Sequence, residues 1–310
     1  MKVLSLFDGM ACGMLAMLEA GFEVERYIAY EIDKYAVQTS SHNFPMIEHR
    51  GDVFTADFTE FSGFDFLMGG SPCTYWSIAQ KNNRETEASG MGWELFTQYV
   101  RALHEAKPKY FIYENNKSMS STIRECITNT FGFEPHCINS ALVSAQRRWR
   151  LYWVGKRNDD GTYSRVDIAP PDDKKIYLEN ILEAGDFAPY SGGELIREKP
   201  DLTENYGDTW RIGVTGRSGG QAVRVYDLKG KSVALQSQAG GGGAKTGRYL
   251  VNDSVKSLSK TGAMKLQTVP TWYEFPVSDQ QAITLLGNGW TVDVIAHLLK
   301  ETKVQPDERL

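Results

Sequence analysis

The chain has 310 residues, of which 24% are charged and 41% hydrophobic, and its formal net charge is −5. These values are typical of a globular protein with one large and one smaller domain, and the sequence predicts no run long enough to span a bilayer. Its four scattered cysteines (Cys12, Cys73, Cys126 and Cys137) exclude a disulfide scaffold, and their spacing predicts no metal site.

The first 55 residues follow a strand, turn, helix, strand order. The apolar run Val3 to Leu6 predicts a strand, residues 8–13 a turn, and residues 14–20 a helix. A second predicted strand over residues 27–31 ends in Glu31, and Asp52 follows a third short strand. In nucleoside sites the turn lets backbone N–H groups approach the ligand, and the acid accepts hydrogen bonds from ribose hydroxyls. Plain α/β packing would give the same pattern.

A possible nucleophile follows the next strand. Phe64 to Leu67 predicts a buried strand, which Gly69, Gly70 and Pro72 end. Cys73 would therefore lie at the carboxyl end of a strand, where open α/β sheets place their chemistry. Pro72 would hold the thiol on a stiff turn. The alternative is an ordinary buried cysteine with no chemical role.

The region after Cys73 contains a long polar stretch and a second acidic strand end. Residues 78–93 show no helical or strand period, and are either a lid or a surface loop. A helix is predicted over residues 95–107 and a strand over residues 110–113, which ends in Glu114. A half-buried carboxylate at this place is a candidate proton donor. A cap of the following helix is the equally open alternative.

The rest of the chain is richer in arginine and glycine. Three arginines in residues 147–150 precede the predicted strand 151–154. They either form a solvated edge of the sheet or contact an anion or a base. Residues 159–200 are rich in Asp, Pro and Gly, which predicts a linker and a domain boundary. Residues 210–250 contain seven Lys or Arg against one acid, Asp227, and many glycines, which predicts short strands with a phosphate-binding patch or a solvated basic loop. Two helices are predicted over residues 277–300.

Together these segments resemble the DNA (cytosine-5)-methyltransferases, in the family's order and over nearly the whole chain. The matching motifs, in chain order, are Leu6-Phe7-Asp8-Gly9, Glu31, Asp52, Pro72-Cys73, Glu114-Asn115, Gln146-Arg147-Arg148-Trp149-Arg150, the segment 258–270 with Gln267, and Gly287-Asn288. The resemblance implies an α/β fold, with a Rossmann-like S-adenosylmethionine-dependent methyltransferase domain and a smaller β-rich target-recognition domain. The implied boundaries are 1–185 for the catalytic domain, 186–276 for the recognition domain, and 277–310 for a segment returning to the first.

The resemblance also implies roles for single residues. Cys73 would attack cytosine C6, Glu114 would act at N3, and Arg148 and Arg150 would hold O2. The S-adenosylmethionine contacts would come from Phe7, Asp8, Gly9, Glu31, Ile32, Asp52, Val53, Pro72, Leu95, Asn288 and Trp290.

A closer likeness lies in the recognition loops. Residues 216–226 and 240–247 are similar to those of the family's GCGC-specific bacterial members. Gln221 would fill the space left by the flipped cytosine, and Arg224 would read a guanine. Gly240, Gly241 and Ser77 would also contact DNA.

Some positions depart from the family pattern. Ala11, Cys12, Asn116, Gly262 and the pair Gly289-Trp290 differ from the commoner residues. None is a predicted catalytic residue, so we expect an active enzyme. The resemblance further implies a monomer that acts on double-stranded DNA in the cytoplasm of a bacterium or a phage-infected cell. Restriction-modification or evasion of restriction would be its purpose. A silent DNA-binding relative and an RNA-modifying member remain the alternatives.

Overall fold

The structure is a computed structural model that describes residues 1–78, 84–198, 208–216, 221–237 and 247–304. The chain divides into two compact units. Unit 1 contains residues 1–138, 149–170 and the C-terminal part from residue 295, and unit 2 contains residues 139–148 and 171–294. This is a structural division, and the assignment of a catalytic and a recognition role to parts of the chain stays a prediction.

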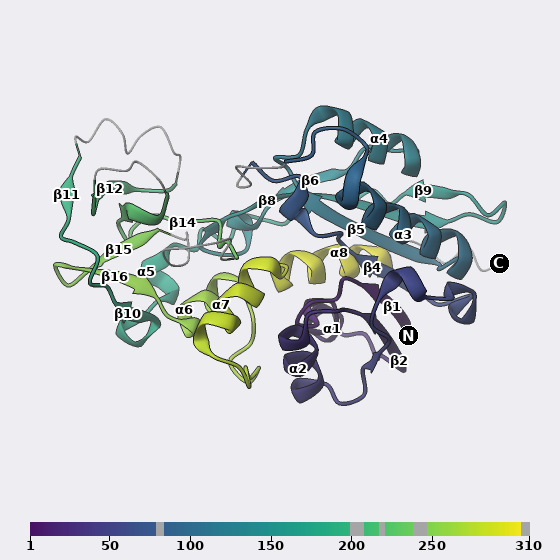
Figure 1. The fold of residues 1–310 in the computed structure, drawn as a ribbon, viewed down its shortest axis with the longest axis horizontal. Helices are drawn as coiled ribbons and strands as arrows, with labels where there is room; N and C mark the ends of the chain where they lie inside the picture. The colour runs from purple at the N-terminus through teal and green to yellow at the C-terminus, as the bar shows by residue number, and fades with distance from the viewer. Residues whose placement is uncertain (79–83, 199–207, 217–220, 238–246, 305–310) are drawn as a thin grey trace. The chain divides into compact units, whose positions relative to one another are not determined.

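Unit 1 is built on a mixed sheet with the strand order β3-β2-β1-β4-β5-β8-β6, and β9 pairs with β8 (Figure 1). Its strands are β1 (Lys2–Leu6), β2 (Arg26–Tyr30), β3 (Glu48–His49), β4 (Phe66–Gly69), β5 (Tyr110–Asn116), β6 (His136–Asn139), β8 (Trp149–Arg157) and β9 (Tyr163–Arg165). Strands β1 to β5 pair in parallel, whereas β8 runs antiparallel to β5. The parallel strands therefore bring their carboxyl ends to one edge of the sheet.

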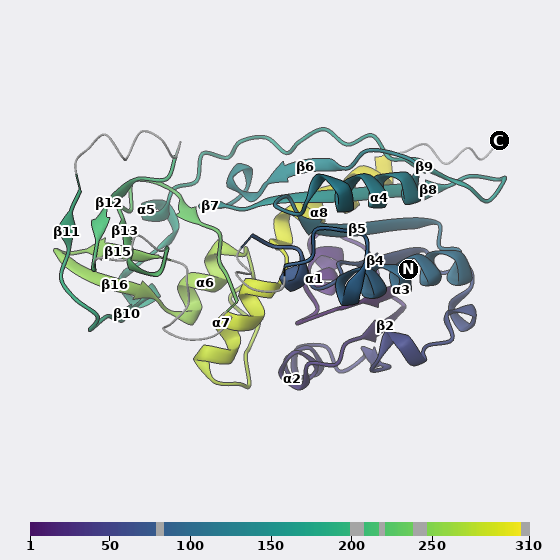
Figure 2. The same cartoon turned by 45° about the horizontal axis from the view of Figure 1, so that its top comes forward.

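The helices of this unit are α1 (Cys12–Glu19), α2 (Lys34–Asn43), α3 (Gly90–Ala106), α4 (Ser121–Phe131) and most of α8 (Val292–Val304). Figure 2 shows α3 and α4 on the same side of the sheet. Phe96 and Tyr99 of α3 and Phe131 of α4 pack with Phe111 and Tyr113 of β5 in one aromatic core. This core fixes the strand that carries Glu114 and Asn115 in its last three residues.

Unit 2 contains a six-stranded sheet with the order β10-β16-β15-β13-β12-β11 and a small parallel pair, β7 with β14. Its elements are β7 (Gln146–Arg147), α5 (Leu178–Ile181), β10 (Phe187–Pro189), β11 (Ile196–Arg197), β12 (Arg211–Val214), β13 (Arg224–Tyr226), β14 (Ser232–Val233), β15 (Arg248–Val251), β16 (Ser254–Leu258), α6 (Lys260–Leu266) and α7 (Asp279–Asn288). The prediction of short strands in residues 210–250 is confirmed. The prediction of an unstructured linker over residues 159–200 is wrong, because this stretch contains β9, α5, β10 and β11. The division between the two units at residues 170 and 171 does fall within it.

The prediction that no run is long enough to cross a bilayer is wrong for the stretch that contains helices α7 and α8. The stretch Asp279–Lys303 is long and apolar enough to do so by length and composition. However, 61% of its apolar window is buried inside the protein, as in a core helix. Gly289 also ends α7 in an extended conformation before α8 begins.

Candidate active site

The turn after β1 has an unusual backbone. Phe7, Gly9 and Ala11 have φ angles of 56°, 60° and 61°, in the left-handed region that is costly for the two non-glycine residues. The backbone N–H of Gly9 donates to Oε2 of Glu31 at 2.8 Å, and Oε1 of Glu31 accepts from the N–H groups of Ile32 and Asp33. Glu31 therefore joins the ends of β1 and β2 at the predicted nucleoside site.

Asp8 lies buried in the same turn. Its Oδ1 accepts from the hydroxyls of Ser5 at 2.6 Å and Tyr27 at 2.7 Å. Its Oδ2 is buried and has no hydrogen-bond partner among the residues that the structure describes. Burial raises the pKa of the carboxyl from 3.8 to about 6, and the nearby Glu31 adds to this shift, while the two hydroxyls oppose it.

We expect Asp8→Asn to remove a pH-dependent loss of stability. Because the folded chain binds this proton more tightly than the unfolded chain, the contribution of Asp8 is fully present below about pH 3.8 and is lost as the pH rises through about 6. The loss amounts to roughly 3 kcal/mol. An asparagine oxygen can still accept from Ser5 and Tyr27. Urea unfolding between about pH 4 and pH 7 should show the variant gaining stability relative to the wild type. A difference that is constant over this range would contradict the assignment.

The other predicted cofactor residues of unit 1 follow β2, β3 and β4 or lie on α3. Oδ1 of Asp52 accepts from the N–H of Phe54 and caps a short 3₁₀ turn that begins at the buried Val53. Arg101 of α3 donates to the carbonyl of Val53 at 2.8 Å, which fastens this turn to the helix. Ile32 is 76% exposed, and Leu95 is partly buried against the core.

Cys73 begins a 3₁₀ turn (Cys73–Tyr75) directly after Pro72. Its side chain is partly exposed, and its carbonyl accepts from the N–H groups of Trp76 at 3.1 Å and Ser77 at 2.9 Å. Trp76 is fully buried and donates from Nε1 to Glu85 at 3.1 Å. The thiol is thus mounted on a turn that a buried indole anchors.

The predicted lid, residues 78–93, is tied to this turn in its described part. Arg84 donates to the carbonyl of Trp76 at 3.0 Å and to that of Ser118 at 2.6 Å, and the N–H of Glu85 donates to Tyr75 at 2.8 Å. Residues 90–93 are helical, so the loop ends earlier than predicted. Residues 79–83 lie outside the described parts. Sequence reasoning missed Arg84 and Glu85, for which no local pattern exists.

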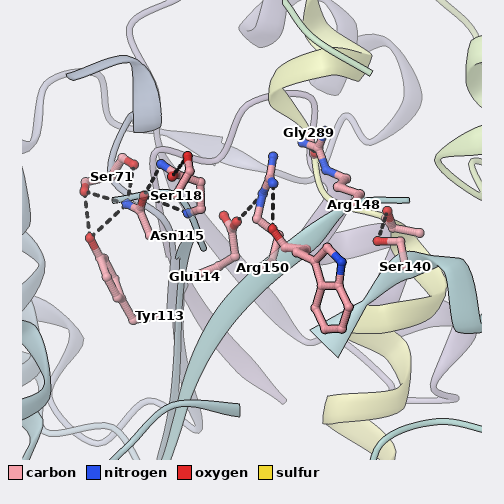
Figure 3. Close-up of polar contacts among 12 residues, drawn as sticks. Ser71, Tyr113, Glu114, Asn115, Ser118, Ser140, Arg148, Arg150 and Gly289 are labelled. Carbon is pink, nitrogen blue, oxygen red and sulfur yellow. Dashed lines mark hydrogen bonds and ion pairs between the residues drawn. The ribbon is translucent and has the colours of Figure 1, made fainter. Parts of the chain in front are cut away.

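Glu114 and Arg150 form an ion pair at the ends of β5 and β8. Figure 3 shows the two side chains pointing toward one another, and Nε of Arg150 lies 2.9 Å from Oε1 of Glu114. The side chains are only 12% and 16% exposed. A Cβ at Gly70 would lie 2.7 Å from the Glu114 carbonyl oxygen and 2.9 Å from Oε2. Glycine at this position therefore lets the chain that leads to Cys73 pass directly beside Glu114.

Asn115 joins β5 to the Cys73 turn from the buried side. Its Nδ2 donates to the carbonyl of Ser71 at 3.1 Å, and the hydroxyls of Ser71 and Tyr113 lie 2.7 Å apart (Figure 3). Burial raises the pKa of Tyr113, which keeps its hydroxyl protonated as a hydrogen-bond donor. The Glu-Asn motif thus combines one carboxylate at the strand end with one amide that fixes the neighbouring turn.

Arg148 of unit 2 is placed differently from Arg150. It is 3% exposed, and its guanidinium donates to the carbonyls of Leu235, Gly287 and Gly289 at 2.8, 3.0 and 2.9 Å. Figure 3 shows this side chain beside Gly289. Arg148 thus donates to three backbone carbonyls, although the motif predicts the same role for Arg148 and Arg150.

The remaining predicted residues of unit 2 are Asn288, exposed at the end of α7, and Trp290, partly buried between α7 and α8. Gln221 begins a short 3₁₀ turn, and Arg224 begins β13 opposite Val214. Gly240 and Gly241 lie outside the described residues. In the described parts of the chain, no group of three His, Cys, Asp or Glu side chains is placed to hold a metal ion.

Gly262, a departure from the family pattern, has a steric reason. A Cβ there would lie 2.5 Å from the carbonyl oxygen of Asp186 and from a methyl carbon of Leu258. Lys265, one turn further along α6, pairs with Asp186 at 2.7 Å. The close packing of α6 on this segment therefore requires glycine.

Comparisons with known proteins agree with this geometry. The family model described as C-5 cytosine-specific DNA methylase matches residues 1–304. The type II methyltransferase M.HhaI of Haemophilus parahaemolyticus is 26% identical, over 96% of this chain and 93% of that protein. The orphan methyltransferase M.Rho11sI of Bacillus phage rho11s is 28% identical, over 82% of this chain and 61% of that protein.

A solved structure, the S. pombe Dnmt2 methyltransferase, superposes with a TM-score of 0.66 at 14% identity, over 98% of this chain and 99% of that one. At this identity the likeness shows a shared fold. The expected fold class, a Rossmann-like methyltransferase domain with a smaller β-rich part, is confirmed. The family model covers nearly the entire chain, so the chain belongs to the C-5 cytosine-specific DNA methylase family.

Proposed function

We propose that this DNA (cytosine-5)-methyltransferase transfers a methyl group from S-adenosylmethionine to C5 of a cytosine flipped out of duplex DNA, with Cys73 as the nucleophile. The observation that carries the proposal is the arrangement at the ends of β4 and β5. Gly70 lets the chain leading to Cys73 pass beside the Glu114 carboxylate, and Asn115 fixes the intervening Ser71.

Cytosine C5 is too weak a nucleophile to accept a methyl group unaided. Addition of the Cys73 sulfur to C6 forms an S–C6 bond and shifts an electron pair toward C5, while N3 takes a proton from Glu114. After C5 is methylated, its proton is lost to solvent, and the electron pair of the broken C–H bond re-forms the C5–C6 double bond as the C6–S bond breaks. The sulfur leaves as the Cys73 thiolate, and the N3 proton returns to Glu114.

Arg150 supports this chemistry from β8. Its Nε lies 2.9 Å from Oε1 of Glu114, and this contact orients the carboxyl group. The remaining guanidinium donors suit the cytosine O2, where negative charge develops as the sulfur adds. In this proposal Arg150 both orients the carboxyl group and stabilises the ring.

The turn after β1 fits the cofactor. Buried Oδ2 of Asp8 has no partner among the described residues, and a Cβ at Gly9 would meet open space. The carboxylate of Glu31 accepts three backbone N–H groups, which leaves about one of its four lone-pair sites for a ribose hydroxyl. Phe7 and Asp52 are the proposed adenine contacts. When bound, S-adenosylmethionine supplies a methyl group carried on a sulfonium. The other proposed contacts are Ile32, Val53, Pro72, Leu95, Asn288 and Trp290.

Target recognition is proposed to lie in unit 2. A base in a duplex cannot reach the thiol, so the cytosine has to leave the stack. Gln221 is proposed to fill the vacated space, and Arg224 to read a guanine through N7 and O6. Gly240, Gly241 and Ser77 are proposed to contact the DNA as well.

Arg224→Ala should relax specificity at one guanine of the target site. Loss of a bidentate contact costs about 1–3 kcal/mol, or roughly 10- to 100-fold in discrimination at that position. Methylation of duplexes that carry each base at each position of the site measures the effect. Unchanged preference at every position would show that Arg224 does not read the site.

The experiment that tests the function is bisulfite sequencing of plasmid DNA from cells that express the chain. Methylated cytosines in one short sequence context are expected. Two alternatives remain: a silent DNA-binding relative, and a member that acts on RNA. If folded protein binds duplex DNA but leaves it unmethylated, the first alternative is favoured. Methyl transfer to tRNA in direct competition with duplex DNA would favour the second.

The proposed setting is the cytoplasm of a bacterium or of a phage-infected cell, where the protein acts as a monomer. Relatives that match the chain include a type II methyltransferase and an orphan phage methyltransferase. Protection of DNA from a restriction enzyme is consistent with both.

A further inference from the structure

The main chain of Leu235 is held from both sides by the Gln-Arg-Arg-Trp-Arg motif. Its N–H donates to Oε1 of Gln146 at 2.7 Å, and its carbonyl accepts from Nη1 of Arg148 at 2.8 Å. All three residues are buried, with exposures of 1%, 0% and 3% for Leu235, Gln146 and Arg148. Both backbone polar groups of one buried residue thus depend on two side chains of a distant segment.

Gln146 is itself oriented by α6. Its Nε2 donates to the carbonyl of Leu266 at 3.0 Å and to Oε1 of Gln267 at 3.1 Å. Its strand β7 pairs in parallel with β14, and Gln146 lies opposite Ser232. The amide of Gln146 therefore presents its oxygen to Leu235 in a fixed orientation.

Arg148 is oriented by the end of α7. Its Nη2 donates to the carbonyls of Gly287 and Gly289 at 3.0 and 2.9 Å. A Cβ at Gly287 would lie 2.4 Å from the backbone N of Ser237, so this segment passes directly against α7. One guanidinium thus links residues 235–237 to the helix that ends in Asn288.

We propose that Gln146 and Arg148 are positioning residues that fix the segment Ala234–Ser237. This inference rests on the proposed function. In the sequence, the segment leads directly into residues 238–246, which carry Gly240 and Gly241. Gln221 also approaches it, since its Nε2 lies 3.5 Å from the carbonyl of Ala234. Arg148 therefore acts through Leu235 on target recognition rather than on the cytosine ring.

Hydrogen exchange tests the structural part without requiring activity. In Gln146→Leu and in Arg148→Gln, peptides covering residues 232–237 should exchange at least about tenfold faster than in the wild type. Arg148→Lys, which keeps a donor, should restore part of the protection. Arg147→Gln removes a charge at the neighbouring position and is the matched control. Unchanged exchange in both Gln146→Leu and Arg148→Gln would overturn the proposal.

Kinetics test the functional part. Both variants should raise the KM for target DNA by about 10- to 100-fold, whereas single-turnover methylation at saturating DNA changes by less than about threefold. Because both side chains hold the backbone of the same residue, Leu235, the KM of the double variant should be hardly higher than that of either single variant. A fall of the saturated rate in Arg148→Gln alone, with unchanged KM, would show a catalytic role and overturn the proposal.

The wild-type chain separates this test from the proposed function. If the wild type methylates no DNA, the function fails while the exchange result still stands. If the wild type methylates DNA, but Gln146→Leu and Arg148→Gln exchange faster and keep the wild-type KM, the positioning role fails alone.

Discussion

Replacing Cys73 with serine should abolish cytosine methylation, with a fall in rate of at least about 10⁴-fold. A serine hydroxyl is a far weaker nucleophile than a thiol, so the bond to C6 does not form. The turn should survive, because Pro72, the hydrogen bonds to the carbonyl of residue 73, and the buried Trp76 are unchanged. Bisulfite sequencing of plasmid from expressing cells and single-turnover assays on the purified protein measure the loss.

Cys137→Ser is the matched control. Cys137 is exposed on β6 and has no proposed role, so this variant should methylate DNA at the wild-type rate. A duplex with 5-fluorocytosine at the target adds a direct readout, since fluorine cannot leave C5 as a proton does. The wild type and Cys137→Ser should form a stable covalent complex with it, whereas Cys73→Ser should not. Methylation by Cys73→Ser above about 1% of the wild-type rate would exclude Cys73 as the nucleophile.

The order of strands, turns and acids around the site is predictable from the sequence because each signal is local. A buried apolar strand followed by two glycines and Pro72 has few ways to continue, and the strand that ends in Glu114 is marked by its own apolar run. Parallel pairing then brings these ends to one edge. The start of α3 was predicted too late, because Gly90 and Gly92 disfavour a helix. Glu85 accepts from the N–H of Gly92 and stabilises that first turn.

Contacts between distant segments could not be predicted. Gln146 and Arg148 meet Leu235, which lies 89 and 87 residues further along the chain. No periodicity or spacing rule connects such positions. The motif alone groups Arg148 with Arg150, although one donates to backbone carbonyls and the other pairs with a carboxylate. The departure at Gly262 could not be explained from the sequence either, since glycine is required there by the close approach of the Asp186 carbonyl.

Glu114→Gln should lower the single-turnover rate at saturating DNA by about 10²- to 10³-fold. An amide cannot pass a proton to N3, so negative charge accumulates on the ring as the sulfur adds. The shape of the side chain and one acceptor for Arg150 are kept. The KM for DNA should change little, because recognition is proposed to lie in unit 2. Adduct formation with the 5-fluorocytosine duplex should slow by a similar factor, since the addition step itself needs the proton.

The ion pair between Glu114 and Arg150 means that Glu114→Gln should change stability as well as rate, and the two effects are measured separately. Neutralising Glu114 leaves the mostly buried Arg150 without its carboxylate, which should lower the free energy of unfolding by about 1–3 kcal/mol. Rates are therefore compared well below the unfolding midpoint, with the exposed Glu125→Gln as the matched control. Arg150→Lys retains a charge near Glu114 but loses the planar guanidinium group, so its single-turnover rate should lie between those of the wild type and Glu114→Gln. If Glu114→Gln is destabilised but forms the adduct at the wild-type rate, Glu114 serves the fold and the proton reaches N3 from another group.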